Sequence, residues 1–415
     1  MTFRYRCSRC GRTYAPDEVT YTCPEDDGNL DVWLDYPSLK RVLSPSFPGL
    51  MGNVPSLWRY LPLLPVPDPD FATTPLASVG WTPVFSPPAL RQATGLSWLW
   101  LKDESRNPTA SLKDRASAVV VARALALGVD TVITASTGNA GAALAGMAAA
   151  VGLRAVILAP KGAPRAKIAQ LLIYGAQVCL VDGTYDDAFD LSIEASETLG
   201  WYCRNTGFNP FTVEGKKTVA YEIWEQVLLR QRLERPLHIF VPVGDGNIIS
   251  GVYKGFWDLQ QLGWLEQKPR LYGVQAEGSA AIARAWEAGA TEVASVQAQT
   301  IADSISVDLP RDGRRALRAV RETHGAYLTV SDEAILEAMA ELGRVGLFAE
   351  PAAATAWAGL REALRRGWLT PEDPVLVLLT GSGLKDVQAA MQAVPPAPVV
   401  PAGNLPALRR ALGLD

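Results

Sequence analysis

The 415-residue sequence predicts an α/β protein with two layered α/β domains, each built around a mostly parallel sheet. Short apolar runs alternate along the chain with segments of helical periodicity, and each run ends in a turn that contains Gly or Ser. The length and a hydrophobic content of 48% allow two or three domains with large cores. Together these observations predict repeated strand–turn–helix units.

Six apolar runs are the predicted strands. They are Thr131–Ala135, Ala155–Ala159, Val178–Val181, Leu237–Val243, Leu271–Gln275 and Val375–Leu379. A helix is predicted after Lys113, with Gly128 as its C-terminal stop. Because ligands bind beyond the carboxyl ends of the strands in such sheets, we expect the functional residues in the turns that follow them.

The same runs, with two Pro-rich stretches, predict the domain order. We expect an N-terminal ribbon-like element at 1–35, a large α/β domain at 36–115 and 206–393, a small α/β domain at 116–205 and a C-terminal tail at 394–415. Prolines between residues 44 and 90 exclude long helices there and predict an extended arm, which Trp58 and Tyr60 could hold on the body. The tail is Pro-rich and then helix-like.

The charge and the cysteine content limit which partners and which cellular compartment we expect for this chain. A net charge of −4 gives no reason to expect a nucleic-acid or membrane partner. The N-terminus lacks the apolar region of a signal peptide, and no stretch of about 18 apolar residues predicts a spanning helix. Five cysteines fit a reducing cytoplasm better than a disulfide framework. The two histidines, His238 and His324, argue against a His-based triad or a multi-His metal site.

Three cysteines near the N-terminus resemble the ligands of a zinc ribbon. Cys7 and Cys10 form a CxxC pair, and Cys23 would belong to a second knuckle. A fourth cysteine is missing, and Asp26 could take its place. The element is therefore either a structural zinc site or a metal-free ribbon that has kept its small β-fold.

The first functional turn is Asn107–Arg115, which contains Lys113. Asn-Pro-Thr is a helix-start signal, so Lys113 is predicted in the first helical turn. The positive end of the helix dipole favours a neutral amine there, as a Schiff-base lysine requires. A surface lysine in a Lys-Asp-Arg cluster is the alternative.

Three further turns follow predicted strands. Ser136–Gly141 opens a helix whose free N–H groups suit a carboxylate, although an ordinary capped turn would look similar. Val243–Ile248 has the form of a cradle for one phosphate and lacks the spacings of ATP and dinucleotide loops. In the turn Thr380–Asp386, a hydroxyl can bond a ring nitrogen. An amine, a carboxylate pocket, a phosphate cradle and a ring-nitrogen partner are the parts of a pyridoxal-phosphate (PLP) site.

The four turns resemble those of the fold-type II PLP enzymes of the tryptophan synthase beta-like superfamily, and specifically the threonine synthase family. The resemblance covers about residues 75–390 and is carried by NPTASLKDR, STGNAG, VPVGDGN and LTGSGLKD in the order of that family. Similar stretches also begin at Gly80, Asn209, Glu214 and Glu350. The cysteine-bearing N-terminus also occurs in that family.

The resemblance implies a role for each site residue and a homodimeric enzyme. Lys113 would hold PLP as a Schiff base in the large domain and then shuttle protons. Asn139 would bond the phenolic oxygen of the cofactor, and Thr380 would meet its pyridine nitrogen. The cofactor phosphate would bind to Gly244, Asp245, Gly246, Asn247 and Ile248. The amino-acid substrate would bind to Ser136, Thr137, Asn139 and Thr206.

Four departures from the family pattern concern the substrate and the cofactor. Ala110 and Leu112 replace Gly and Phe, and Asp245 places a carboxylate beside the cofactor phosphate. Thr212 stands where threonine synthases carry an arginine that grips the substrate phosphate. The polar segment 303–311 could also shape a different substrate pocket. Other cations would have to bind a phosphorylated substrate, and the candidates are Lys161, Arg165, Lys216 and Lys217.

The resemblance implies elimination or replacement on an amino acid, with threonine synthase as the first hypothesis. That reaction converts O-phosphohomoserine and water to threonine and phosphate. A serine/threonine ammonia-lyase, a cysteate-synthase-like enzyme using O-phosphoserine or an acyl-transferring PLP subunit are the alternatives on the same scaffold. A ribbon-bearing nucleic-acid binder is the non-enzymatic alternative, and the acidic balance counts against it.

Overall fold

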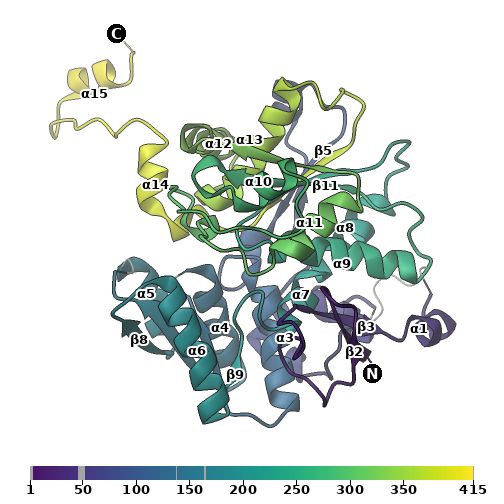
Figure 1. The fold of residues 1–415 in the computed structure, drawn as a ribbon. Helices are drawn as coiled ribbons and strands as arrows, with labels where there is room; N and C mark the ends of the chain where they lie inside the picture. Colours follow the sequence, from purple (N-terminus) through teal and green to yellow (C-terminus); the bar gives the residue numbers. More distant parts are fainter. Residues whose placement is uncertain (1–2, 45–51, 137, 163–164, 415) are drawn as a thin grey trace.

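Three sheets organise the chain in the computed structural model, which describes residues 3–44, 52–136, 138–162 and 165–414. A six-stranded sheet forms the upper half of the molecule in Figure 1, and a four-stranded sheet lies in the lower half. A small three-stranded sheet near the N-terminus packs beside the lower half (Figure 1). The class is mixed α/β with mostly parallel sheets, as predicted.

The six-stranded sheet has the order β12-β11-β10-β13-β5-β4. Its strands are β4 (Val84–Phe85), β5 (Leu99–Asp103), β10 (His238–Pro242), β11 (Arg270–Ala276), β12 (Ala326–Val330) and β13 (Val375–Leu379). All neighbours are parallel except β4 and β5. The carboxyl ends of the five parallel strands therefore lie at one edge, where the predicted turns begin.

Alternate residues of the central strands point to opposite faces of this sheet, as the pleat requires. Ile239 and Val241 pack in one buried cluster, and Phe240 packs in another. Helices cover both faces. The first cluster contains residues of α8 (Thr218–Ile223), α9 (Asn247–Gln261) and α11 (Gly313–Arg321), and the second contains residues of α12 (Asp332–Arg344) and α13 (Pro351–Arg365).

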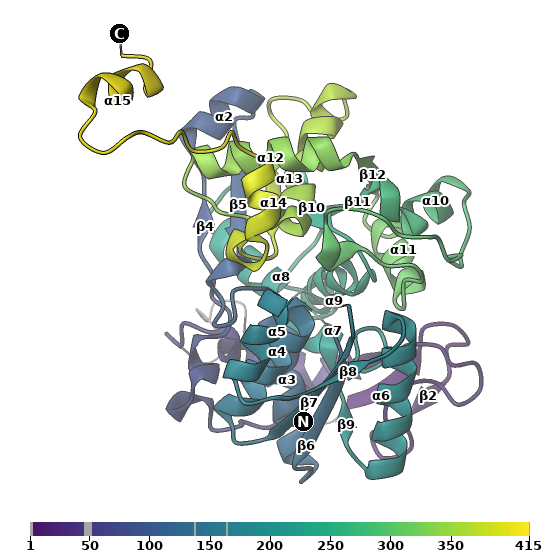
Figure 2. The ribbon, with the colours of Figure 1, turned by 90° about the vertical axis from the view of Figure 1, so that its left-hand side faces the viewer.

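The four-stranded sheet is wholly parallel, with the order β8-β7-β6-β9. Its strands are β6 (Thr131–Ala135), β7 (Arg154–Pro160), β8 (Gln177–Val181) and β9 (Tyr202–Cys203). In Figure 2 the sheet lies between α6 (Tyr185–Leu199) on one side and α3 (Lys113–Ala126), α4 (Asn139–Ala150) and α5 (Arg165–Ile173) on the other. All its strands lie within 116–205, and those of the larger sheet lie outside, so we propose the predicted domain boundaries.

The N-terminal element is an antiparallel sheet of order β2-β1-β3, formed by β1 (Phe3–Cys7), β2 (Thr13–Tyr14) and β3 (Leu30–Leu34). It is followed by α1 (Tyr36–Val42). The ring of Phe3 packs edge-on against Phe211 of α7 (Phe211–Lys216), with centroids 6.0 Å apart. This small sheet is therefore attached to the helix that precedes α8 in the large domain.

The remaining elements are short. They are α2 (Pro88–Thr94), α10 (Ala281–Glu287), α14 (Val387–Gln392), α15 (Leu405–Ala411), a π-helical turn at Trp224–Leu228, and 3-10 turns at Leu57–Leu63, Phe71–Thr73, Pro75–Ser78, Glu104–Arg106, Glu277–Ser279, Asp303–Ile305 and Gly383–Lys385. Trp58 and Tyr60 are buried, as expected for the Pro-rich arm, of which residues 45–51 lie outside the described residues. The last helix, α15, lies away from the body (Figure 1). Among the described residues, none of the helices has the length and apolar character that crossing a bilayer requires.

Candidate active site

A cavity of about 370 Å³ lies at the carboxyl ends of strands from both large sheets. It is lined from the small sheet by residues that follow β6 and β7, and from the large sheet by residues that follow β10. Most of the predicted site residues line it: Lys113, Ser136, Asn139, Thr206, Gly244, Asp245, Gly246, Asn247 and Ile248. Thr380 is not part of the lining, and Thr137 lies outside the described residues.

Lys113 is the first residue of α3, so it lies at the helix N-terminus as predicted. The loop before it is held at several points. The N–H of Leu112 donates to the carbonyl of Thr380 (2.9 Å). The N–H of Thr109 donates to the Asp114 carboxylate (2.6 Å). These bonds fasten the loop to the end of β13 and to α3, and they fix where the lysine amine can reach.

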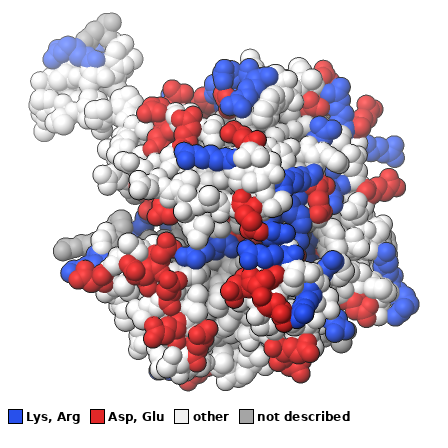
Figure 3. All heavy atoms as spheres, in the orientation of Figure 1, with Lys and Arg blue, Asp and Glu red and all other residues white. Residues whose placement is uncertain are grey.

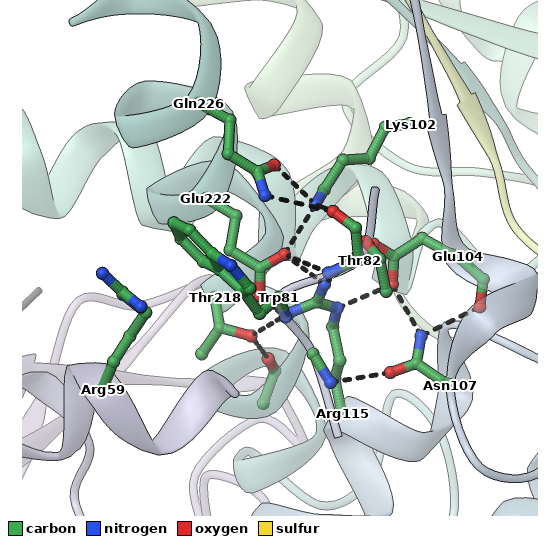
Figure 4. A network of polar contacts seen from close by, with 12 residues as sticks. Arg59, Trp81, Thr82, Lys102, Glu104, Asn107, Arg115, Thr218, Glu222 and Gln226 are labelled. Atoms are coloured by element: carbon green, nitrogen blue, oxygen red, sulfur yellow. Dashed lines mark hydrogen bonds and ion pairs between the residues drawn. The ribbon is translucent and has the colours of Figure 1, made fainter. Parts of the chain in front are cut away.

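A buried ion network anchors the first turn of α3 through Arg115 (Figure 4). Arg115 donates to the carboxylates of Glu104 and Glu222, and all three side chains are fully buried. Lys102 of β5 donates to Glu222 (2.6 Å) and to the carbonyl of Thr82 (2.7 Å). The network therefore ties α3 to β5 and α8. The family-like stretches that begin at Gly80 and Glu214 both contribute residues to this network (Figure 4).

The environment of Lys113 favours its neutral form. Burial lowers the pKa of the Lys113 amine, because an ammonium loses its hydration inside the protein. The nearby carboxylate of Glu350 opposes this shift, and the positive charge of Arg204 adds to it. A neutral amine on the wall of a cavity can act as a nucleophile toward a carbonyl group and as a base.

The turn after β10 forms the opposite wall of the cavity. Gly246 is the N-cap of α9 and has a φ of 88°, which favours glycine, so no side chain caps the first N–H groups of that helix. A Cβ at Gly244 would lie 2.8 Å from the Cα of Ile305, so the close approach of segment 303–307 also requires glycine. The Nδ2 of Asn247 donates to Asp312 (2.8 Å). This is a rigid helix N-terminus suited to an anion.

Asp245 is the one acidic residue within this cradle. The N–H of Arg311 donates to its Oδ1 (3.3 Å). Burial raises the pKa of Asp245, while the Arg311 N–H and the positive charge of Lys216 oppose that rise. Its negative charge is therefore partly offset by protein groups before any ligand binds.

Lys216 is a second lysine at the cavity wall, and it is almost fully buried. Its Nζ donates to the Oδ1 of Asn247 (2.5 Å). Burial lowers the pKa of Lys216 well below its usual value, and the positive charges of Arg204 and Lys113 lower it further. Asp245 and Asp312 oppose this shift, and an anionic ligand would add to their effect and favour the charged form of Lys216.

Arg204 lies behind Thr206 and is fully buried. Its Nη1 donates to the Thr206 hydroxyl (2.5 Å), and its Nη2 has no hydrogen-bond partner among the described residues. Burial lowers the pKa of Arg204 to about 10. A buried guanidinium with an unused donor is costly unless a ligand accepts from it.

The four cations that the sequence offered for a substrate phosphate lie in different environments in the structure. Lys216 lines the cavity, whereas Lys217 is buried in ion pairs with Glu214 and Asp258. Lys161 is exposed and pairs with Asp182, and the side chain of Arg165 lies outside what the structure describes. Thr212, where an arginine was expected, is buried, and its hydroxyl donates to the Asn209 carbonyl.

Three contributors had no role assigned from the sequence, namely Arg204, Glu350 and Ser304, although Glu350 begins a family-like stretch and Ser304 lies in the polar segment 303–311. The Nδ2 of Asn139 donates to both carboxylate oxygens of Glu350 (2.7 and 2.9 Å) and to Ser304 (3.3 Å). The sequence carried a partial signal for Glu350, which precedes a proline at the start of α13. Arg204 follows the two-residue strand β9, which gave no sequence signal.

Thr380 has a free hydroxyl beside the Lys113 loop. The side chain is 1% exposed, and its Oγ1 has no hydrogen-bond partner among the described residues. An unpaired buried hydroxyl is costly, so it indicates a missing acceptor or donor. Its place next to Leu112 is compatible with the predicted contact to a ring nitrogen.

The donor set fits the cofactor that the sequence predicted. A neutral amine, a helix N-terminus without a side-chain cap and an unpaired hydroxyl correspond to the aldehyde, phosphate and ring nitrogen of PLP. Figure 3 shows Lys and Arg side chains gathered in a band across the middle of one face, where the two halves of the molecule meet. Anionic molecules would be attracted to that band.

A family model described as pyridoxal-phosphate dependent enzyme matches residues 76–381. The threonine synthase of Methanosarcina acetivorans is 37% identical over 99% of this chain and 98% of its own length. That of Methanocaldococcus jannaschii is 37% identical over 94% of both chains. Among solved structures, diaminopropionate ammonia lyase from Escherichia coli superposes with a TM-score of 0.67 at 20% identity, covering 84% of this chain and 94% of that one.

Proposed function

This chain belongs to the threonine synthase family of pyridoxal-phosphate-dependent enzymes, and from that premise we propose that it converts O-phosphohomoserine and water to threonine and phosphate. It is a PLP-dependent lyase with a small-molecule substrate. The observation that supports the proposal most is one cavity that combines the amine of Lys113 with the buried amine of Lys216, whose lowered pKa an anionic substrate would raise again. The first group serves the cofactor, and the second serves an anionic substrate.

Eight residues would hold the cofactor through groups that the structure leaves available. Lys113 would bind it covalently through Nζ, and the N–H groups of residues 244–248 would bind its phosphate at the start of α9. Thr380 would hydrogen-bond the ring nitrogen, and Asn139 would face the phenolic oxygen. When bound, the cofactor supplies an electron sink for negative charge that develops beside the substrate Cα.

The substrate carboxylate would bind at the start of α4. Ser136 and Asn139 line the cavity there, and the N-terminus of this 12-residue helix favours an anion. The hydroxyl of Thr206 extends the same wall. These groups orient the substrate so that its Cα lies within reach of the Lys113 amine.

We assign the substrate phosphate to Lys216 and Arg204, in place of the arginine that is missing at position 212. The positive charge of Arg204 already lowers the pKa of Lys216, so an anion beside Lys216 would relieve an existing repulsion. The unpaired Nη2 of Arg204 offers a further donor, with Thr206 between it and the cavity. A planar guanidinium and a lysine together suit a phosphate dianion.

Lys113 would then move the protons of the reaction. Its Nζ would take the proton from the substrate Cα and would later act as an acid. Across the whole reaction the Cγ–O bond breaks and phosphate leaves. Cγ ends as a methyl group, and the hydroxyl of water adds to Cβ. Glu350 lies close enough to Lys113 to favour the ammonium form electrostatically, which helps the amine to accept a proton.

The deciding experiment incubates the full-length holoenzyme separately with O-phosphohomoserine, O-phosphoserine, serine and threonine. Phosphate, ammonia and threonine are measured in each case. We expect equal amounts of phosphate and threonine from O-phosphohomoserine and little product from the other three. No phosphate from O-phosphohomoserine would reject the proposal. Phosphate from O-phosphoserine, or ammonia from serine or threonine, would identify one of the alternative activities.

A homodimer and a cytoplasmic location stay predictions from the sequence. Light scattering of the purified holoenzyme would test the first, because the chain has a mass of 44.6 kDa and a dimer has twice that mass. A mass of one chain at micromolar concentration would contradict the dimer. Fractionation of cells that produce the protein would test the location.

A further inference from the structure

Four potential metal ligands lie together in the N-terminal sheet, away from the cavity described above. They are the Sγ atoms of Cys7, Cys10 and Cys23 and a carboxylate oxygen of Asp26, all within 4.8 Å of one another. Cys7 ends β1, and the other three residues lie in the turns before and after β2. Cys7 and Cys23 are buried, while Cys10 is exposed.

The distances between these atoms match one tetrahedral zinc ion. With Zn–S bonds of about 2.3 Å, two sulfur ligands of a tetrahedral site lie about 3.8 Å apart. Cys10 and Cys23 have their Sγ atoms 3.7 Å apart. The Sγ of Cys7 lies 3.2 and 3.6 Å from the two carboxylate oxygens of Asp26, close to the spacing of a sulfur and an oxygen on one zinc.

The groups around the ligands also fit a metal. The N–H groups of Arg9 and Cys10 donate to the Sγ of Cys7 (3.3 and 3.4 Å), which stabilises a thiolate there. The hydroxyl of Tyr14 lies 3.1 Å from the Sγ of Cys23. The N–H of Gly28 donates to the Oδ1 of Asp26 (3.0 Å) and so orients this carboxylate.

We propose that Cys7, Cys10, Cys23 and Asp26 bind one structural Zn²⁺. Three thiolates and one carboxylate carry enough negative charge for a divalent ion, and three sulfur ligands favour zinc over magnesium or calcium. The protein supplies all four ligands, so no position stays open for a substrate, as is usual for structural sites. Asp26 takes the place of the cysteine that the sequence pattern lacks.

The zinc site supports the active site through β3 and the turn before it. The Nδ2 of Asn29 donates to the carbonyl of Gly207, next to Thr206, and to that of Arg311 (3.1 Å). Arg315 donates to the carbonyl of Leu30 (3.0 Å) and to Asp312. Asp312 in turn accepts from Asn247 of the phosphate cradle. Loss of the metal would loosen these residues and, with them, the cofactor cradle.

The first test measures metal content in the full-length holoenzyme by plasma mass spectrometry. We expect about one zinc per chain, as one four-ligand site requires. Cys10→Ser removes an exposed ligand without disturbing packing and should lose the zinc. Cys179→Ser alters the other exposed cysteine, which lies on β8, and should keep it. Asp26→Cys supplies the fourth sulfur and should keep one zinc against a higher chelator concentration than the natural protein.

Thiol labelling tests the same site without metal analysis. Only Cys10 and Cys179 are exposed, so a thiol reagent should label Cys179 at once and Cys10 only after a chelator is added. Immediate labelling of Cys10 in the protein as purified, before any chelator is added, would overturn the proposal. A mass deficit of two hydrogens, which would mean a Cys10–Cys23 disulfide, or one equivalent of iron instead of zinc would also overturn it.

The proposed support of the cofactor cradle by the zinc site can be measured separately. After chelation, release of the cofactor is followed by its absorbance during gel filtration, with Cys10→Ser as the control that has no metal to lose. We expect release several times faster from the chelated natural protein than from the untreated one. Unchanged release would contradict the supporting role. None of these measurements uses a substrate, so they are independent of the proposed reaction.

Discussion

Glu222 is the centre of the buried network below Lys113, and its replacement by glutamine tests how that network stabilises the fold. Its carboxylate accepts from the backbone N–H groups of Trp81 and Thr82, from Lys102 and twice from Arg115. Glutamine has the same shape but offers one acceptor oxygen and an NH₂ donor that would face other donors. Lys102 and Arg115 would then be buried with one carboxylate fewer between them.

Two estimates of the free energy of unfolding that is lost in Glu222→Gln agree. Burial alone would raise the pKa of Glu222, but Arg115 and Lys102 outweigh it and lower that pKa from 4.5 to about 2. A shift of this size corresponds to about 3 kcal/mol, since one pKa unit is about 1.4 kcal/mol. Removing one partner of a buried ion pair costs about 3–5 kcal/mol. At roughly 2 °C per kcal/mol for a large domain, Glu222→Gln should lower the Tm by about 6 °C.

A matched control variant, Glu362→Gln, distinguishes the effect of a buried ion pair on stability from that of an exposed one. Glu362 pairs with Arg365 and Arg366 on the exposed side of α13, and hydrogen bonds from Arg365 in particular lower its pKa to about 2 as well. Water screens these pairs, and helix pairs of this spacing are worth about 0.3–0.5 kcal/mol each. Glu362→Gln should therefore lower the Tm by no more than about 2 °C.

The pH dependence gives a second measurement. Because the folded pKa of Glu222 lies below its ordinary value, its stabilisation is fully present above about pH 4.5 and is lost as the pH falls toward about 2. The Tm difference between the natural protein and Glu222→Gln should therefore shrink across that range. Equal Tm losses in Glu222→Gln and Glu362→Gln, or a difference that does not change with pH, would refute the reasoning.

Three further predictions concern the site and its loop. Ala110 has a φ of 65°, a conformation that costs an alanine about 1–2 kcal/mol, and the greater freedom of glycine in the unfolded chain cancels about half of that gain. Ala110→Gly should therefore raise the Tm by about 1–2 °C in a thermal melt, and a lower Tm would contradict the strain. Lys216→Gln removes a charge-assisted bond worth about 1.5–3 kcal/mol, so the KM for O-phosphohomoserine should rise about 10- to 100-fold. The control Lys161→Gln should leave that KM unchanged, and equal KM values in the two variants would exclude Lys216 from the phosphate site. Asp245→Asn removes a carboxylate from the cradle and should tighten cofactor binding about tenfold in an absorbance titration of the apoprotein. Weaker binding would show instead that the charge of Asp245 is needed to keep Lys216 in place.

The six strands predicted from apolar runs are all present, within one or two residues of the predicted ends. The strands β4, β5, β9 and β12 of the two α/β sheets were missed. β5 has the sequence LWLKD, in which Lys102 and Asp103 interrupt the apolar pattern although both are buried. The carboxylate that makes burial of Lys102 tolerable belongs to Glu222, 120 residues later in the chain. Local periodicity cannot show such a partner.

The turns of the site were predictable because a parallel sheet brings the carboxyl ends of its strands to one edge. That rule required only the order of strands and turns, which was visible for the turns after β6, β10 and β13 but not for the Lys113 turn, which follows the missed strand β5. Arg204 and Glu350 were not predictable in the same way. The place of Arg204 depends on a two-residue pairing of β9 with β6, which no propensity indicates. Glu350 reaches Asn139 across the boundary between the two α/β bodies.

Of the departures from the family pattern, Asp245 and part of segment 303–311 line one cavity in the structure, whereas Thr212 is buried outside its lining. Thr212 removes a cation, Asp245 adds an anion, and either change alone would weaken binding of two phosphates in one site. Lys216 and Arg204 lie where they can offset both changes, because Lys216 bonds the cradle residue Asn247 and Arg204 bonds Thr206 on the wall. Charge complementarity depends on the summed field at a site and not on which residue carries each charge. A site that has lost one arginine can therefore keep a phosphorylated substrate, provided that its cations are buried around the same cavity.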